Sequence, residues 1–420
     1  MIIGIDDTDS RSEGGCTTYI AAVLVDRLKN YGDLVGYPLL IRLNPNIRYK
    51  TRGNGAIAIN IDTDNPEKVK RIVLNEVKNQ SKLSDENTNP GVVFLNGVSE
   101  NLRNDLRSFS RCAIQDILRI EDAKHVINKY NIDFYEFKNG RGLIGALAAA
   151  GIASTGMPDH TFELIAYRRS SMIGTPREID LRSIREADLR TYPETWDTVD
   201  IANKTIVCAP HGNDPVLFGI RGEMDGVIDA YNYIRSEPVE RFTLFMTNQG
   251  TDMHLVRSTI DQTVDGRSYI LKGVISSAPR TICGGHVIFG MRNSKSRIDC
   301  AAFEPTKNFR YIVRQLVVGD QVVVCGSVNN KTVHLEKMKI ERLADRYEIR
   351  NPMCTCGRRM KSAGVGQGYR CKKCGNVSDV PDRVLIERNL DCGWYEVPPC
   401  ARRHIAKPLV RCVGDVHPGR

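Results

Sequence analysis

The 420-residue sequence contains no hydrophobic run that approaches the roughly 18 residues needed to cross a membrane. Its start, MIIGIDDTD, lacks the basic region and the longer apolar region of a secretory signal. Internal repeats and low-complexity segments are also absent. The 13 cysteines are an odd number in a long chain, which argues against a disulfide framework and in favour of metal ligation. These absences predict a globular, cytoplasmic protein with no membrane partner.

Positive charge is concentrated at the C-terminal end. At about 150 residues per domain, the chain is long enough for roughly three domains. The net charge is +9, and residues 346–420 hold 15 Lys and Arg against 7 Asp and Glu, so nearly all of the excess lies there. A local excess of this kind favours a polyanionic partner such as nucleic acid over a role in solubility alone.

Strands and helices alternate in the first half of the chain, which predicts a multidomain α/β and α+β fold. Strands are expected at 1–6, 38–44 and 56–61, and helices at 17–32, 66–80 and 110–131. Further on, strands at 160–169, 205–210, 216–222 and 240–248 accompany a helix at 225–236. That order fits a small α+β sandwich of the ferredoxin-like kind.

Closely spaced short strands dominate residues 263–349, with a helical turn only near 309–316. Five such segments suit an OB-type barrel, whose curved face commonly binds single-stranded nucleic acid, and an SH3-like barrel is the alternative. The pattern KGVISSAPR…GGHVIFGM…IDCAAF…VVGDQVVVCGSV also resembles the anticodon-binding OB family, which favours the OB interpretation.

Two cysteine knuckles follow the expected barrel. Cys354 and Cys356 are separated by 14 residues from Cys371 and Cys374, a spacing that predicts a zinc ribbon with four thiolate ligands. Basic residues surround both knuckles, so the ribbon would present a stiff platform suited to phosphates. A less regular set could form a second metal site or consist of free thiols: Cys392, Cys400, His404 and Cys412.

Three carboxylates end the first expected strand, in the stretch IGIDDTDSRSEGGCTTY. Hard oxygen donors at a strand end suit Mg²⁺, which takes one or two carboxylates together with substrate phosphates. On an extended segment Asp7 and Asp9 share a face, so we expect these two to be the ligands, with Asp6 as a candidate third. The alternative is an Asx-type turn followed by a helix that Thr17 or Thr18 caps.

Two glycine-containing segments are candidates for binding ATP phosphates. RYKTRGNGA joins basic residues to a turn whose backbone N–H groups could face an anion. NGRGLIGALAAAGIA matches G-x-G-x-x-G, with Glu163 about 20 residues further on, so a dinucleotide fold, a phosphate-facing helix start and ligand-free helix packing all stay open. The expected phosphate-binding residues are Lys50, Arg52, Gly53, Gly55, Gly140, Arg141 and Gly142.

The whole chain resembles the archaeal tRNA(Ile) 2-agmatinylcytidine synthetase family, abbreviated TiaS. The most distinctive matches are IGIDDTDSRSEGGCTTY, YKTRGNGAIAIN, APHGNDPVLFGIRG and the barrel with its CxC…CxxC tail. The resemblance implies a kinase-like catalytic domain at 1–157 and a ferredoxin-like domain at 158–262. An OB-fold domain at 263–345 and a basic zinc-ribbon domain at 346–420 would follow.

The resemblance also implies an activity. Such an enzyme uses ATP to couple agmatine to the 2-position of the wobble cytidine in an isoleucine tRNA with a CAU anticodon. The base is phosphorylated first, and decoding switches from AUG to AUA. The family's first domain is also credited with phosphorylating a threonine of its own, which corresponds here to Thr18. The HGNDP loop, with His211 and Asp214, is a candidate for shaping the active site or meeting agmatine, and a plain hairpin turn is the alternative.

Two other classes of protein provide contrast. A non-enzymatic tRNA or single-strand nucleic-acid-binding protein would use only the barrel and ribbon, and it predicts no ATP turnover. A nicotinamide-dependent oxidoreductase would use the glycines at 140–145 and would have no use for a basic tail. Neither class accounts for both ends of the chain.

Overall fold

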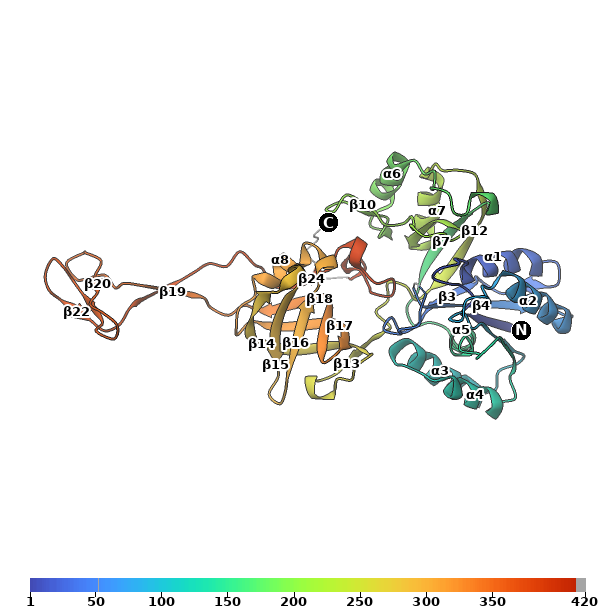
Figure 1. Ribbon diagram of the computed structural model, residues 1–420, viewed down its shortest axis with the longest axis horizontal. Coiled ribbons are helices and arrows are strands. Elements are labelled where there is room, and N and C mark those ends of the chain that lie inside the picture. The colour runs from blue at the N-terminus through green and yellow to red at the C-terminus, as the bar shows by residue number, and fades with distance from the viewer. Residues whose placement is uncertain (52, 413–420) are drawn as a thin grey trace.

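The computed structural model describes residues 1–51 and 53–412 of the chain. An N-terminal sheet with its helices, a barrel and a small ribbon follow one another along the long axis of the molecule, with the barrel in the middle (Figure 1). Among the described residues, none of the helices combines the length and the apolar composition needed to cross a membrane.

The first part of the chain forms one half of a ten-stranded sheet, in the order β6-β5-β1-β4-β3. Its strands are β1 (Ile2–Asp6), β2 (Asp33–Leu34), β3 (Leu39–Arg42), β4 (Gly55–Asp62), β5 (Gly91–Leu95) and β6 (Asp133–Glu136), with β2 paired to β4. Its helices are α1 (Thr17–Leu28), α2 (Pro66–Gln80), α3 (Glu100–Gln115), α4 (Ile120–Lys129) and α5 (Leu143–Thr155).

Alternation along β1 decides which helices cover which face of this half. Ile3 and Ile5 are fully buried in the core that contains α1 and α2. Ile2 lies in the second core, together with the apolar residues of α3, α4 and α5. Successive side chains of a strand point to opposite faces, so the short run IIGID builds both cores at once.

The second part continues the same sheet in the order β12-β7-β11-β8. Its elements are β7 (Thr161–Arg168), α6 (Leu181–Thr191), β8 (Thr195–Trp196), β11 (Val216–Gly222), α7 (Met224–Tyr233) and β12 (Val239–Thr247), with a small hairpin of β9 (Val199–Asp200) and β10 (Thr205–Ile206). The parallel pairing of β12 with β3 joins the two halves, whose other strand pairs are antiparallel. Sequence patterns did not indicate α6, and the strand expected at 205–210 is reduced to β10.

The predicted five-stranded barrel is confirmed. It closes in the order β14-β15-β16-β18-β17, with β17 paired back to β14, and α8 (Phe309–Arg314) lies between the third and fourth strands in the sequence. The strands are β14 (Ser268–Thr281), β15 (Val287–Arg292), β16 (Arg297–Ala302), β17 (Gln321–Asn329) and β18 (Thr332–Arg342), and β13 (Leu255–Arg257) adds to β14. Short 3-10 helices lie at Ser170–Met172, Ile260–Gln262, Cys283–Gly285, Glu304–Thr306, Pro399–Ala401 and Leu409–Arg411.

The last part of the chain divides into two pieces. A two-stranded stalk of β19 (Tyr347–Arg350) and β23 (Asp382–Leu385) carries the ribbon strands β20 (Lys361–Ser362), β21 (Tyr369–Arg370) and β22 (Val377–Ser378) away from the barrel (Figure 1). The chain then returns, and β24 (Gly393–Glu396) pairs with β18. We call residues 393–412 the C-terminal strap, because they run from the barrel back to the N-terminal sheet, where Ile405 enters the core.

Candidate active site

A cavity of about 770 Å³ lies where the two halves of the sheet meet the C-terminal strap. It is lined by the end of β1, the start of α1, the loop before β4, the loop before β11 and two strap residues. Of the residues predicted from sequence, it brings together Asp6, Asp7, Asp9, Thr18, Lys50, Gly53, Gly55, Arg141, His211 and Asp214. Gly140 and Gly142 are not among the described residues that line it, and Arg52 lies outside the described residues.

The aspartate turn is not the extended segment that strand alternation suggested. β1 ends at Asp6, and Asp7 has a φ of +61°, in the left-handed region. The Asp7 N–H donates a hydrogen bond of 2.7 Å to Oδ1 of Asp6. Asp6 and Asp7 are therefore not sorted onto opposite faces, and the argument that only Asp7 and Asp9 share a face was wrong. The turn instead directs all three carboxylates to one cavity.

The charge of this turn is only partly compensated. Burial raises the pKa of Asp7 to about 6, although the Arg141 guanidinium, 2.7 Å from its Oδ2, acts in the opposite direction. Burial and the neighbouring Asp7 charge raise the pKa of Asp6 well above its usual range. Asp9 accepts a hydrogen bond of 2.8 Å from the Thr51 hydroxyl. A cation in this part of the cavity would relieve the unfavourable charge.

The three aspartates do not form a preassembled cage. Within the described part of the chain, the only group of three or more metal-type ligands whose donor atoms lie within 4.8 Å of one another is the cysteine set of the ribbon. Asp6 as a candidate third ligand stays a prediction. Its carboxylate also lies close to α5, because a Cβ on Gly145 would lie 1.9 Å from Asp6 Oδ2.

The glycines before and within α5 serve close packing. A Cβ on Gly142 would lie 2.6 Å from the Asp6 carbonyl oxygen, so glycine is required for the start of α5 to approach the end of β1. The strands on this side of the sheet pair antiparallel, unlike those of a dinucleotide-binding fold. The dinucleotide interpretation was therefore wrong. Arg141, Ile144 and Gly145 of this segment line the cavity, where the Arg141 guanidinium meets Asp7.

The second glycine loop is shaped around an arginine. A Cβ on Gly53 would lie 2.4 Å from Nη1 of Arg42, and one on Gly55 would lie 3.1 Å from the same atom. Lys50 of this loop donates to the Pro45 carbonyl, and its pKa is lowered by burial and by the nearby charges of Arg403 and Arg11. The loop thus holds two cationic side chains at the cavity wall.

The start of α1 presents its threonines without capping. The N-cap residue is Cys16, and it makes no side-chain capping bond, so the proposed Thr17 or Thr18 cap was wrong. Thr17 instead shares a buried hydrogen bond of 2.9 Å with Thr8. The Thr18 hydroxyl lies 2.9 Å from the Cys16 sulfur at the cavity edge.

The HGNDP loop contains one structural and one exposed residue. Asp214 is buried, and its Oδ1 accepts from the Val216 N–H at 3.1 Å and from Arg177 at 3.3 Å, which is the behaviour of an Asx-type turn. His211 is exposed at the cavity mouth. A Cβ on Gly14 would lie 2.4 Å from the Asn213 carbonyl, so this loop packs directly on the loop that follows the aspartates.

Sequence patterns missed a buried ion-pair network on the cavity wall. Glu163, 3% exposed, lies 3.1 Å from Arg221 Nε and 3.5 Å from Arg42 Nη2. Gln249 donates to the other side of the same carboxylate at 2.5 Å. His404 of the strap lines the cavity beside these residues. The available signal was an acidic residue inside a strand that is fully buried.

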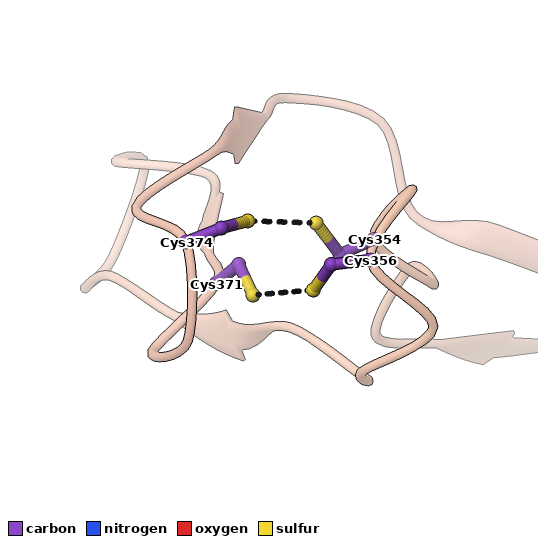
Figure 2. A group of neighbouring side chains, drawn as sticks. All are labelled: Cys354, Cys356, Cys371 and Cys374. Atoms are coloured by element: carbon purple, nitrogen blue, oxygen red, sulfur yellow. Dashed lines mark hydrogen bonds between the residues drawn. The ribbon is translucent and has the colours of Figure 1, made fainter.

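The four ribbon cysteines converge as predicted (Figure 2). Cys354 and Cys374 sulfurs are 3.3 Å apart, and those of Cys356 and Cys371 are 3.6 Å apart. These separations are too long for disulfides and approach the roughly 3.8 Å edge of a tetrahedron with 2.3 Å Zn–S bonds. The second candidate set, Cys392, Cys400, His404 and Cys412, is not gathered into a ligand group among the described residues.

Comparisons with known proteins agree over the whole chain. The TiaS TCKD domain model matches residues 2–139, the TiaS FLD domain model matches 140–254, and the TiaS C-terminal zinc ribbon domain model matches 351–390. The tRNA(Ile2) 2-agmatinylcytidine synthetase TiaS of Methanosarcina mazei is 54% identical, over 98% of this chain and 97% of its own length.

Solved structures show the same likeness. The crystal structure of a TiaS-tRNA(Ile2)-ATP complex is 45% identical and superposes with a TM-score of 0.92, covering 99% of this chain and 98% of that one. A TiaS-tRNA(Ile2)-AMPCPP-agmatine complex is 42% identical, with a TM-score of 0.89 over 99% of this chain and 98% of that one. With its acidic turn, shared sheet, closed barrel and zinc ribbon all in place, the chain belongs to the TiaS family of tRNA(Ile2) 2-agmatinylcytidine synthetases.

Proposed function

We propose that this protein uses ATP to couple agmatine to the 2-position of the wobble cytidine in an isoleucine tRNA with a CAU anticodon. The observation that carries the proposal is the cavity, where the aspartate turn, Lys50, Arg141 and the candidate acceptor Thr18 meet. The chain is also 54% identical to a curated tRNA(Ile2) 2-agmatinylcytidine synthetase. The related structures hold tRNA(Ile2) with ATP, and tRNA(Ile2) with AMPCPP and agmatine. A protein that only bound tRNA would have no use for this cavity.

The chemistry explains why phosphate-handling residues are needed. The oxygen at position 2 of cytosine leaves poorly, so it is first phosphorylated. The primary amine of agmatine then attacks C2, the C2–O bond breaks, and phosphate departs with that oxygen. Phosphoryl transfer depends mainly on positioning and charge neutralisation, which the charged and polar loops lining the cavity supply.

Asp7 and Asp9 are the residues that would hold Mg²⁺. The site fits the ion because Mg²⁺ takes one or two carboxylates and completes its shell with phosphate oxygens and water. Burial also raises the pKa of Asp6 and Asp7, so a bound cation would stabilise their charged forms. When bound, the ion neutralises charge on the phosphates. Arg141 orients Asp7 through two contacts, at 2.9 and 2.7 Å, and the Thr51 hydroxyl orients Asp9.

The remaining predicted residues take roles around this turn. Lys50, with the backbone of Gly53 and Gly55, would contact ATP phosphates from the loop before β4. Arg52, which lies outside the described residues, stays a predicted phosphate contact. Thr18, at the start of α1, would accept a phosphoryl group. His211 stands at the cavity mouth, where it could meet agmatine, while Asp214 keeps its loop in shape.

Domain assignments follow the same proposal. We assign residues 1–157 as kinase-like and 158–262 as ferredoxin-like; the sheet order β12-β7-β11-β8, which is 4-1-3-2 in chain order with α6 and α7 as crossovers, supports the second label. The barrel at 263–345 has the strand order of an OB fold, and 346–420 holds the basic ribbon. Barrel and ribbon would hold the tRNA while the wobble base, unstacked in its loop, enters the cavity.

Incorporation of labelled agmatine tests the function. Purified protein, Mg²⁺, ATP and labelled agmatine are incubated with an isoleucine tRNA carrying CAU, and a matched transcript with a different wobble base is the control. We expect label only in the first RNA and only with ATP. Absence of ATP-dependent label in that RNA would exclude the proposed activity.

A pair of threonine variants tests the acceptor role. Thr18→Ala should abolish transfer of label from ATP to the protein while changing the melting temperature little, because Thr18 does not cap α1. Thr17→Ala removes the buried bond to Thr8 and should lower stability by about 1 kcal/mol while keeping the acceptor. Retained protein labelling in Thr18→Ala would assign the acceptor elsewhere.

A further inference from the structure

His404 reaches the cavity from the opposite end of the chain. It belongs to the C-terminal strap and lies outside the residues matched by the three family models, 2–139, 140–254 and 351–390. A Cβ on Gly53 would lie 3.3 Å from the His404 Cδ2 atom, so the imidazole packs on the glycine loop itself. The strap therefore contributes to the wall of a site otherwise built from the N-terminal sheet and its loops.

The strap backbone holds this histidine firmly. The His404 carbonyl accepts from the Gly250 N–H at 2.9 Å, and the next carbonyl, of Ile405, accepts from Thr251 and Asp252 at 3.1 and 3.0 Å. The Ile405 side chain is 2% exposed in the N-terminal core. On the other side, Arg403 bonds to the Ser327 hydroxyl at 3.0 Å. A side chain fixed on both flanks is preorganised for a ligand.

The surroundings of His404 are cationic. Arg42, Arg221 and Lys50 line the same cavity. The Glu163 carboxylate is shared between the two arginines, and Asp197 lies 4.0 Å from Nη1 of Arg221. The Arg221 charge, followed by burial and the charges of Arg42 and Lys50, holds the pKa of His404 well below its usual range. The imidazole is therefore neutral. It adds a hydrogen-bonding group to the cavity without a positive charge that Arg42, Arg221 and Lys50 would repel.

One ring nitrogen lacks a partner. His404 Nδ1 is shielded from solvent and has no hydrogen bond within the described residues. A buried polar atom without a partner is unfavourable, and such atoms concentrate where a ligand or ordered water completes the site. An unsatisfied neutral imidazole beside two arginines and a glycine loop is suited to an anion.

We propose that His404, Arg42 and Arg221 form a phosphate-binding subsite on the wall of the cavity, separate from the aspartate turn. The proposal rests on the proposed function, which brings phosphate groups to this cavity from two sources, ATP and the tRNA backbone. The arginines supply the charge, and His404 supplies a hydrogen bond to a phosphate oxygen. The strap thereby completes a site to which distant parts of the chain contribute.

Binding measurements on three variants test the subsite. His404→Ala removes both ring nitrogens, and His404→Asn keeps an amide near the position of Nδ1. Lys407→Met is the matched control, because Lys407 belongs to the same strap, pairs with Asp159 at 3.2 Å and does not line the cavity. Dissociation constants are measured for Mg-ATP, for adenosine, which lacks phosphates, and for the tRNA without ATP, together with the melting temperature.

We expect His404→Ala to weaken binding of a phosphate-bearing ligand about tenfold, as for one hydrogen bond to a charged group, with adenosine binding unchanged. His404→Asn should recover most of that loss, and Lys407→Met should bind like the wild type. A loss for Mg-ATP alone assigns the subsite to ATP, and a loss for tRNA alone assigns it to the backbone phosphate.

Several results would overturn the subsite. One is that His404→Ala binds both Mg-ATP and tRNA with unchanged dissociation constants. Another is that its affinity for adenosine falls as much as its affinity for Mg-ATP. A third is that Lys407→Met loses as much affinity as His404→Ala, which would indicate a loosened strap. Agmatine incorporation by the wild type separates this proposal from the function. If the wild type incorporates agmatine while the His404 variants bind normally, only the subsite is wrong. If the wild type does not incorporate agmatine but His404→Ala loses ATP binding, only the proposed function is wrong.

Discussion

Replacing Asp7 with asparagine separates a catalytic role of the aspartate turn from a structural one. Asparagine tolerates the left-handed backbone that Asp7 adopts at φ +61°, so the turn should form unchanged. Its amide oxygen can still accept from Arg141, which contacts Asp7 at 2.9 and 2.7 Å. Converting this charge-assisted contact into a neutral one costs about 1 kcal/mol.

A compensating gain limits the effect on stability. Burial raises the pKa of Asp7 to about 6, which means that holding its carboxylate in the cavity is itself unfavourable. An uncharged amide avoids that cost. We therefore expect the free energy of unfolding to change by no more than about 1 kcal/mol, or about 2 °C in melting temperature. Loss of a metal-binding carboxylate should instead reduce agmatine incorporation at least about 100-fold.

The assay measures three quantities on the same preparations: agmatine incorporation, tRNA affinity and melting temperature. Asp85→Asn is the matched control, because Asp85 accepts from Ser10 at 2.5 Å near the same turn but does not line the cavity. We expect the Asp7 variant alone to lose activity, with its tRNA affinity intact. Wild-type activity in a folded Asp7→Asn protein would refute the metal-binding interpretation and leave an Asx-type turn in its place.

Three further predictions concern the ribbon, the strap and the barrel. Cys371→Ser should lose the ribbon's zinc, because three thiolates rarely hold a structural tetrahedral site, while ATP affinity stays unchanged; a fully zinc-loaded variant would disprove the ligand set. Deleting 351–390 should leave the melting temperature of the remaining protein near that of the wild type. Ending the chain at 392 should instead destabilise it by several kcal/mol, since Ile405 leaves the core and the buried Arg402–Asp197 pair is broken; equal melting temperatures would contradict this. Glu336 keeps a pKa of about 2, because the charges of His254 and Arg403 outweigh the effect of burial. Its lowered pKa contributes on the order of 3 kcal/mol of stability above about pH 4.5, and this contribution is lost as the pH falls towards 2. The difference in stability between the wild type and Glu336→Gln should therefore become smaller on acidification. If chemical denaturation gives the same stability difference between the wild type and Glu336→Gln at every pH, the Glu336 carboxylate charge contributes nothing to stability.

Local patterns in the sequence were sufficient for features that depend on neighbouring residues. The helix expected at 66–80 matches α2, and the five barrel strands and the zinc ligands were found in the same way. Hydrophobic periodicity indicates which side of a helix or strand is buried, and the spacing of the cysteines indicates two tight turns that can share one zinc ion. Both signals depend only on residues close together in the sequence. The aspartates, the glycine loop and Arg141 were identified as candidates for similar reasons.

Tertiary structure decided how these pieces meet. The parallel pairing of β3 with β12 joins the halves into one sheet, and no local signal distinguishes it from other pairings of apolar strands. Asp7 adopts a left-handed conformation where β1 ends, which alternation alone could not indicate. Glu163, which the sequence offered only as the acidic residue of a dinucleotide pattern, is instead paired with Arg221 and Arg42, both distant in sequence. His404 lies against Gly53 because β24 pairs with the barrel beyond the ribbon and the strap then returns to the N-terminal sheet. The site thus depends on contacts between distant parts of the chain, which only the tertiary structure brings together.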